Sequence, residues 1–163
     1  LSGETTIGRY PVQTLEIMNK IIQESENDQN YNELVDRTMR SEKQDITGSV
    51  AYSSVECAIR LKCKAIVTPT VSGYTARKIS RFRPNCPIIA ICPDENVVKN
   101  LKLYYGIYPV LEKEVTSFDK IMKISKQIAK EQLHLEEKDK IIVTGGYPFK
   151  EVKHTNFMKI EEI

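Results

Sequence analysis

The sequence predicts an α/β fold, a three-layer α/β/α sandwich built on a mostly parallel five-stranded sheet with one antiparallel edge strand. Two observations support this fold. Short apolar runs of strand length recur from residue 65 onward, and amphipathic stretches of helical period separate them. Strands that are apolar throughout and alternate with helices are typical of a parallel sheet covered on both faces.

Each element has its own local signal. Helices are expected where apolar residues recur at helical spacing, with Pro11 suited to a first turn and Asp94 suited to a cap. The expected helices cover 11–26, 31–39, a stretch that follows Asp45 or Thr47 as cap, 75–83, 94–104 and 117–133. The expected strands are 65–68, 87–92, 107–111, 140–144 and, as the edge strand that returns after a turn-rich loop, 155–160.

The stretch S-E-N-D-Q-N at 25–30 is polar and has no apolar period, so we place a domain boundary there. Residues 1–28 are the first part and 29–163 the second. The chain opens on L-S-G-E-T and not on Met, and we expect it to be a piece of a longer protein.

The amino-acid composition limits the kinds of partner that the chain is expected to bind. A chain of 163 residues with a formal charge of +2 and 40% hydrophobic residues is long enough for one globular domain and too weakly charged to predict binding to nucleic acid or to a membrane surface. No apolar run of membrane-spanning length and no basic-then-apolar leader is present. The four cysteines (57, 63, 86 and 92) lack metal or redox spacing, so we expect free thiols and a cytoplasmic location.

The stretch I-V-T-P-T-V-S-G-Y-T-A at 66–76 carries the main candidate site. Thr70, Ser72 and Thr75 offer hydroxyl groups between a strand and a helix that starts near Tyr74. Gly73 lets the backbone approach a ligand closely, and the helix N-terminus favours an anion. Such a loop could hold a phosphate, but the same residues would equally serve as an ordinary helix cap and turn.

A second loop, T-G-G-Y-P-F-K-E-V-K-H, follows the strand expected at 140–144. It has Gly145 and Gly146 for tight backbone geometry, and it gathers Lys150, Lys153 and His154. This cationic loop could close over a second phosphate, or it could be an exposed connection with ordinary surface lysines. Arg77 and Lys78 lie close enough to the first loop to add positive charge.

The sequence offers no catalytic set. Glu4 has no His, Asp or Lys beside it in the sequence to orient it, and His154 lacks the further ligands that a metal site requires. We expect no catalytic residue and no metal site in this chain.

Five motifs together resemble the pyruvate kinase family, in order and over essentially the whole chain. They are L-S-G-E-T-x-x-G-x-Y-P at 1–11, T-x-S-G-x-T-A-R-x-I-S-R-F-R-P at 70–84, P-I-I-A at 87–90, Y-Y-G-I-Y-P-V at 104–110 and T-N-F-M-K-I at 155–160. The resemblance implies that residues 1–28 are the end of the catalytic barrel and that 29–163 are the carboxyl-terminal regulatory domain of a bacterial-type enzyme.

The resemblance also implies a function for the parent chain: transfer of a phosphoryl group from phosphoenolpyruvate to ADP, with Mg²⁺ and K⁺ held by barrel residues that this chain lacks. The chain itself should therefore be inactive. Its implied partners are its own barrel, a homotetramer and a phosphorylated effector, either a sugar phosphate or AMP. The effector phosphate would be held by Thr70, Val71, Ser72, Gly73, Tyr74 and Thr75.

Departures from the family pattern leave alternatives open. Val71 stands where members with well-developed effector sites have a basic or polar residue, and Lys150 and Lys153 replace glycines. The domain could therefore serve only to assemble the oligomer. A free-standing α/β enzyme that acts on a phosphorylated substrate is the remaining alternative, which the complete reading frame would test.

Overall fold

The computed structural model describes residues 1–41, 45–113, 117–148 and 154–163. It divides the chain into two compact units, Leu1–Asn30 and Tyr31–Ile163. The division falls two residues beyond the boundary expected from the sequence. Within the described ranges, no helix is both long and apolar enough to cross a membrane.

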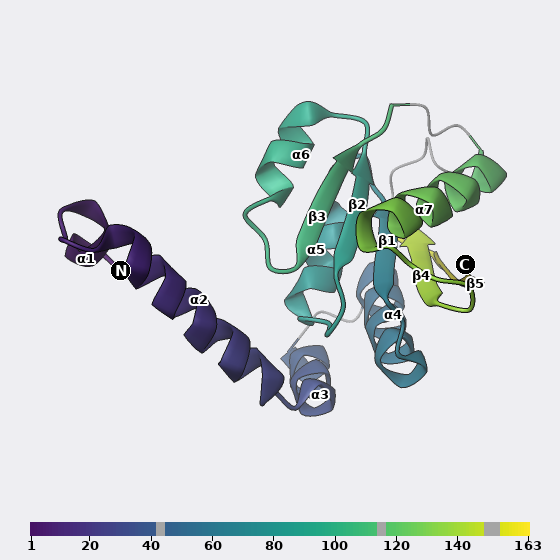
Figure 1. Cartoon of the computed structure of the whole chain (residues 1–163). Coiled ribbons are helices and arrows are strands. Elements are labelled where there is room, and N and C mark those ends of the chain that lie inside the picture. Colours follow the sequence, from purple (N-terminus) through teal and green to yellow (C-terminus); the bar gives the residue numbers. More distant parts are fainter. Residues whose placement is uncertain (42–44, 114–116, 149–153) are drawn as a thin grey trace. The chain divides into compact units, whose positions relative to one another are not determined.

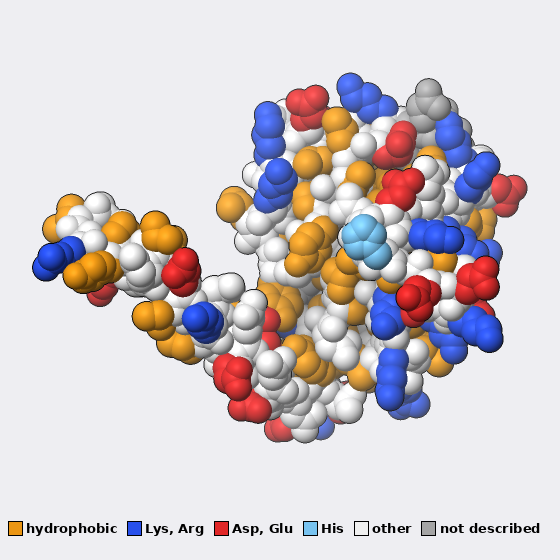
Figure 2. Space-filling model, in the orientation of Figure 1, with side chains coloured by type: hydrophobic (Ala, Val, Ile, Leu, Met, Phe, Trp, Pro, Cys, Tyr) orange, Lys and Arg blue, Asp and Glu red, His pale blue; other side chains and the backbone are white. Residues whose placement is uncertain are grey.

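The first unit consists of α1 (Gly3–Thr6) and α2 (Pro11–Asn27). Pro11 occupies the first turn of α2, where a missing amide hydrogen costs nothing. No residue of α2 is buried, and its apolar side chains are exposed, including Leu15 at 53%, Ile21 at 60% and Ile22 at 47%. Figure 2 shows hydrophobic side chains on the surface of this helix, at the left of the view.

The second unit is the α/β domain. Its helices are α3 (Tyr31–Ser41), α4 (Ile46–Leu61), α5 (Tyr74–Arg81), α6 (Glu95–Leu101) and α7 (Phe118–Leu133). Its strands are β1 (Ala65–Pro69), β2 (Ile88–Cys92), β3 (Ile107–Leu111), β4 (Lys140–Gly145) and β5 (Phe157–Glu162). The sheet order is β3-β2-β1-β4-β5, with every pair parallel except β4 and β5. The predicted fold class is confirmed.

Two apolar clusters lie on opposite faces of the sheet. Alternation along β1 sends Ile66 into the cluster under α3, α4, α5 and α6, and Val67 into the cluster under α7. Figure 1 shows α7 on one side of the sheet and α4 and α5 on the other. The middle strands are buried along their whole length because both faces are covered.

The cysteines are unpaired thiols within this domain. Burial raises the pKa of the Cys86 thiol to about 12, and burial with the charge of Asp94 raises the pKa of Cys92 to about 11. Both groups stay protonated near neutral pH, so they behave as small apolar side chains and not as nucleophiles.

Candidate functional site

Both candidate loops leave the sheet at the same place. β1 and β4 are parallel neighbours in the sheet, so their carboxyl ends lie side by side. The chain leaves β1 toward β2 but enters β4 by way of α7, from the other face. This reversal of strand order is the position at which open α/β sheets bind ligands. A Cβ on Gly145 would lie 3.3 Å from the Pro69 carbonyl oxygen, which shows how closely the loops begin.

The turn after β1 is held by short hydrogen bonds. The Thr70 amide donates to the Ile91 carbonyl at 2.9 Å, and the Gly73 amide donates to Thr70 Oγ1 at 3.1 Å. Gly73 has φ of +74°, and a Cβ there would lie 2.9 Å from Leu101 Cδ2. Glycine therefore satisfies both the backbone conformation and the close approach of α6.

The turn divides its side chains between solvent and interior. Val71, Ser72 and Tyr74 are exposed, whereas Thr70 is 9% exposed and Thr75 is 7% exposed. The first turn of α5 directs the amides of residues 74–76 out of the helix, and no hydrogen bond to them occurs among the described residues. These amides and the Ser72 hydroxyl are the groups that an approaching anion would meet.

The Thr75 hydroxyl has a partner that the sequence did not indicate. Its Oγ1 lies 2.7 Å from Oγ1 of Thr155, and the Thr155 amide donates to Oγ1 of Thr47 at 3.1 Å. Thr155 and Thr47 are each 2% exposed. The three residues come from the start of α5, the segment before β5 and the start of α4. The sequence predicts Thr155 only as part of a strand, because two residues that lie 80 positions apart leave no local pattern.

Positive charge lies beside the turn. Arg77 Nη1 donates to the Ser72 carbonyl at 3.0 Å, and its guanidinium lies 5.9 Å from the centre of the Tyr104 ring. The Lys78 ammonium lies 5.8 Å from the centre of the Tyr74 ring. These contacts keep both cations close to the start of α5, as expected from the sequence.

The second loop is fixed at its base. A Cβ on Gly146 would lie 2.6 Å from the His154 carbonyl oxygen, so this backbone crossing requires glycine. The Asn156 side chain accepts from the Tyr147 amide at 2.8 Å and donates to the Tyr147 carbonyl at 2.6 Å. His154 is exposed. Lys150 and Lys153 lie outside the described residues.

The described residues do not fit a Mg²⁺ site. No group of three or more His, Cys, Asp and Glu side chains in those parts of the chain could hold a metal ion. Hard cations such as Mg²⁺ require a set of oxygen ligands, so no step that uses Mg²⁺ or K⁺ is assigned to this chain.

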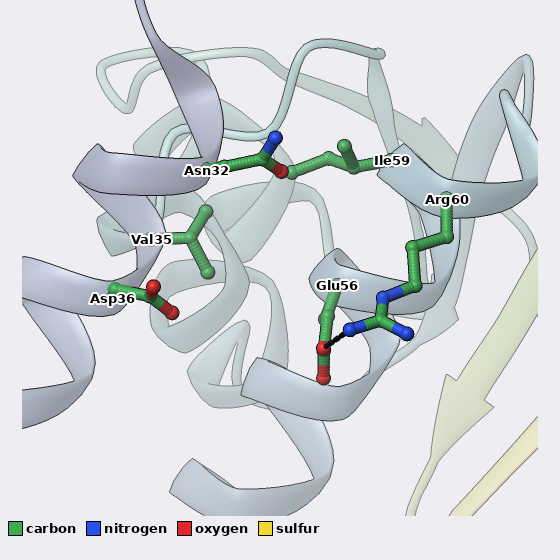
Figure 3. Close-up of a pocket in the computed structure, with 6 residues that line it drawn as sticks. All are labelled: Asn32, Val35, Asp36, Glu56, Ile59 and Arg60. Carbon is green, nitrogen blue, oxygen red and sulfur yellow. Dashed lines mark ion pairs between the residues drawn. The ribbon is translucent and has the colours of Figure 1, made fainter.

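A separate pocket of about 230 Å³ lies between α3 and α4 (Figure 3). It is lined by Asn32, Val35, Asp36, Glu56, Ile59 and Arg60. Arg60 Nη2 and Glu56 Oε1 form an ion pair at 2.8 Å. Because its one cation already has a carboxylate partner and a second carboxylate is present, this pocket is a poor site for a phosphate.

Comparisons with known proteins agree along the whole chain. The family model described as "Pyruvate kinase, alpha/beta domain" matches residues 48–161. Similar curated proteins include the pyruvate kinase of Sporosarcina psychrophila, which is 36% identical over 163 residues, and that of Clostridium acetobutylicum, which is 32% identical. The alignments cover 100% of this chain but only 28% and 34% of those proteins.

A solved structure shows the same architecture. The crystal structure of a pyruvate kinase from Cryptosporidium parvum superposes with a TM-score of 0.85 and 28% sequence identity. The match covers 99% of this chain and 32% of that one. The chain thus spans about a third of the length of the proteins it resembles.

Proposed function

Because the chain belongs to the pyruvate kinase family through its alpha/beta domain, we propose that it is the regulatory part of a pyruvate kinase. The parent enzyme would transfer the phosphoryl group of phosphoenolpyruvate to ADP, giving pyruvate and ATP, with Mg²⁺ and K⁺ bound by its catalytic barrel. Residues 1–28 would be the end of that barrel. The unpaired cysteines support a cytoplasmic location.

The role proposed for this domain is to bind a phosphorylated effector at the turn formed by residues 70–75. One observation carries the proposal. Gly73 begins α5 at the carboxyl edge of the sheet, where the Ser72 hydroxyl, the first amides of the helix and Arg77 lie together, and those amides have no acceptor in the parts of the chain that the structure describes. Backbone amides at a helix N-terminus bind an anion because their hydrogens point outward and the helix dipole is positive there.

The sequence treats the hydroxyls of Thr70, Ser72 and Thr75 as equivalent donors, but their surroundings differ. The Thr70 hydroxyl shapes the turn by accepting from Gly73, and Thr75 is bonded to Thr155. Ser72 is then the hydroxyl with direct access from solvent. The effector would be a sugar phosphate or AMP, and it would act by binding one arrangement of the oligomer more tightly than another.

Calorimetry tests the proposal. The 163-residue chain should bind fructose 1,6-bisphosphate, ribose 5-phosphate or AMP at micromolar to millimolar concentration. Ser72→Asp puts a negative charge where the phosphate would lie, and it should weaken binding by at least about tenfold through like-charge repulsion. Ser53→Asp is the matched control, because Ser53 lies on α4, outside the turn.

Two results would count against the effector role. One is that none of the three compounds binds at millimolar concentration. The other is that Ser72→Asp binds as tightly as the Ser53→Asp control, which would move the site away from the turn.

A second candidate function is assembly of the homotetramer without an effector. It is favoured by β5, an edge strand paired only with β4 along the described sheet, whose Met158 and Ile160 side chains are 37% and 46% exposed. Such an edge can pair with another strand. Sedimentation would then show dimers, and phosphate compounds would leave the melting temperature unchanged.

A further inference from the structure

We infer that Thr155 is a positioning residue that sets the direction of the Thr75 hydroxyl and connects the turn at residues 70–75 to residues 145–147 at the base of the second loop. The part of the inference that concerns anion binding rests on the function proposed above for residues 70–75. The joining of the loops does not depend on that function.

The geometry places three buried threonines in one chain of contacts. Thr75 Oγ1 and Thr155 Oγ1 are 2.7 Å apart, and the Thr155 amide reaches Thr47 Oγ1 at 3.1 Å. All three residues are less than a tenth exposed. Water therefore competes little for these bonds, and each hydroxyl depends on its protein partner.

A hydroxyl has one hydrogen and two lone pairs, so the pair has two states. If Thr75 donates to Thr155, Thr75 has no hydrogen left for an anion. If Thr155 donates to Thr75, the Thr75 hydrogen is available at the start of α5. A nearby anion favours the second state, in which consecutive hydrogen bonds polarise one another. Thr155 thus allows Thr75 to act as a donor while both hydroxyls stay satisfied.

Backbone hydrogen bonds fix Thr155 in place, so its hydroxyl can orient that of Thr75. Thr47 in the first turn of α4 accepts its amide hydrogen, which fixes the backbone at this point. The next amide, that of Asn156, donates to the Gly145 carbonyl at 2.9 Å. The Asn156 side chain then bonds to both backbone groups of Tyr147.

These bonds connect the turn after β1 to the base of the loop after β4. A shift of Thr75 changes the Thr155 hydroxyl contact, and Thr155 is adjacent in sequence to the residue that clamps Tyr147. The two loops begin beside each other at Pro69 and Gly145, so the connection spans a single shared edge. Binding of an anion at residues 70–75 should therefore change the hydrogen bonding of residues 145–148 and 154–156.

The first experiment measures binding of inorganic phosphate and of fructose 1,6-bisphosphate to the 163-residue chain. Thr155→Val, which keeps the shape and removes the hydroxyl, should weaken binding about fivefold or more. Thr155→Ser keeps the hydroxyl and should bind within about twofold of the original chain. Thr68→Val is the control, because Thr68 Oγ1 is buried in β1 and has no hydrogen-bond partner among the described residues.

The second experiment needs no ligand. Thr75→Val should accelerate amide hydrogen exchange at Thr155, Asn156 and Tyr147 severalfold, whereas Thr68→Val should leave these rates unchanged. Circular dichroism of each variant shows whether it is folded. If Thr75→Val does not fold, Thr75→Ala replaces it, because it also removes the hydroxyl and should give the same acceleration, while Thr75→Ser keeps the hydroxyl and should keep the original rates.

The outcomes separate the two proposals. If the original chain binds phosphate and Thr155→Val binds it equally well, the positioning role is overturned while the proposed function stands. If the original chain binds no phosphate but Thr75→Val accelerates exchange at Thr155, the proposed function fails and the joining of the loops stands. If Thr75→Val and Thr68→Val give the same exchange rates, the loops are not joined.

Discussion

Gly73 meets two requirements at the start of α5, and replacing it should measure both. Gly73→Ala forces a side chain into the positive-φ region and brings a Cβ to 2.9 Å from Leu101 Cδ2. The conformational strain alone is about 1–2 kcal/mol. We expect Gly73→Ala to lower the free energy of unfolding by about 2 kcal/mol in urea titrations and to weaken any anion binding at the turn.

Gly106 is the matched control for this substitution. It also has a positive φ, of +66°, but a Cβ added there would meet nothing within 4 Å. Gly106→Ala should therefore show the conformational strain without the contact. An equal loss of stability in the two variants would show that Leu101 adjusts at no cost.

The residues of the turn at 70–75 are predictable from the sequence, but their hydrogen-bond partners are not. The pattern of hydroxyls around Gly73, between an apolar strand and a helix, is by itself enough to indicate the turn. That Thr70 accepts from Gly73 follows from local geometry, since the two are three residues apart. That Thr75 contacts Thr155 follows only from the sheet order, which brings β5 next to β4.

The cap of α6 affects the candidate site because this helix ends in a residue that packs against Gly73. Asp94 accepts from the amides of Asn96 at 2.7 Å and Val97 at 3.1 Å, and it begins a helix of only seven residues. The last residue of that helix is Leu101, which is fully buried and packs against Gly73. A weak cap on α6 would therefore loosen the turn.

Asp94→Ala should lower the free energy of unfolding by about 1 kcal/mol because two amides lose their acceptor. Asp94→Asn keeps an acceptor oxygen and should remain within a few tenths of a kcal/mol of the original chain, apart from the lost charge at the helix N-terminus. Urea unfolding of both variants checks this. Equal stability of Asp94→Ala and Asp94→Asn would contradict a capping role for this side chain.

The helices and strands are largely predictable because the apolar periods and capping residues that define them are local in the sequence. Strand β3 begins and ends where the sequence predicts, and α7 begins one residue after its expected start, with Ser117 as cap. β5 begins at Phe157, two residues later than expected, and the Thr155 amide before it donates to Thr47 of α4 and not to β4. The short helix α1 has no signal in the sequence, since four residues carry no measurable period.

For the whole molecule, the division into two units leads to a prediction about stability. Both apolar clusters of the domain begin at Val35 or later, so the core contains no residue of the first unit. A chain of residues 31–163 should unfold cooperatively in urea with a free energy within about 1 kcal/mol of the full chain, while the helical signal of α2 disappears from circular dichroism.

Sedimentation compares the association state of the full chain with that of the chain of residues 31–163. The exposed apolar side chains of α2, among them Leu15, Ile21 and Ile22, should favour self-association of the longer chain. The shorter chain should then be the less associated of the two. A loss of several kcal/mol on removal of residues 1–30 would show that the first unit supports the core.

The balance of charge and the order of the strands differ in how far the sequence predicts them. On the face shown in Figure 2, Lys and Arg side chains are interspersed with Asp and Glu over the α/β unit, in line with the small formal charge. Composition is enough to predict that balance. The order β3-β2-β1-β4-β5 does not follow from apolar periods, which identify strands but not their neighbours. Only resemblance to a family of known fold supplies such an order.

The clamp between Asn156 and Tyr147 has a consequence for how substitutions act in this part of the domain. The Asn156 side chain and the Gly146 crossing hold residues 146–147 against residues 154–156 at the end of β4. A substitution at either Gly146 or Asn156 would therefore displace backbone on both sides of the clamp at once, so neither position is free to vary without the other.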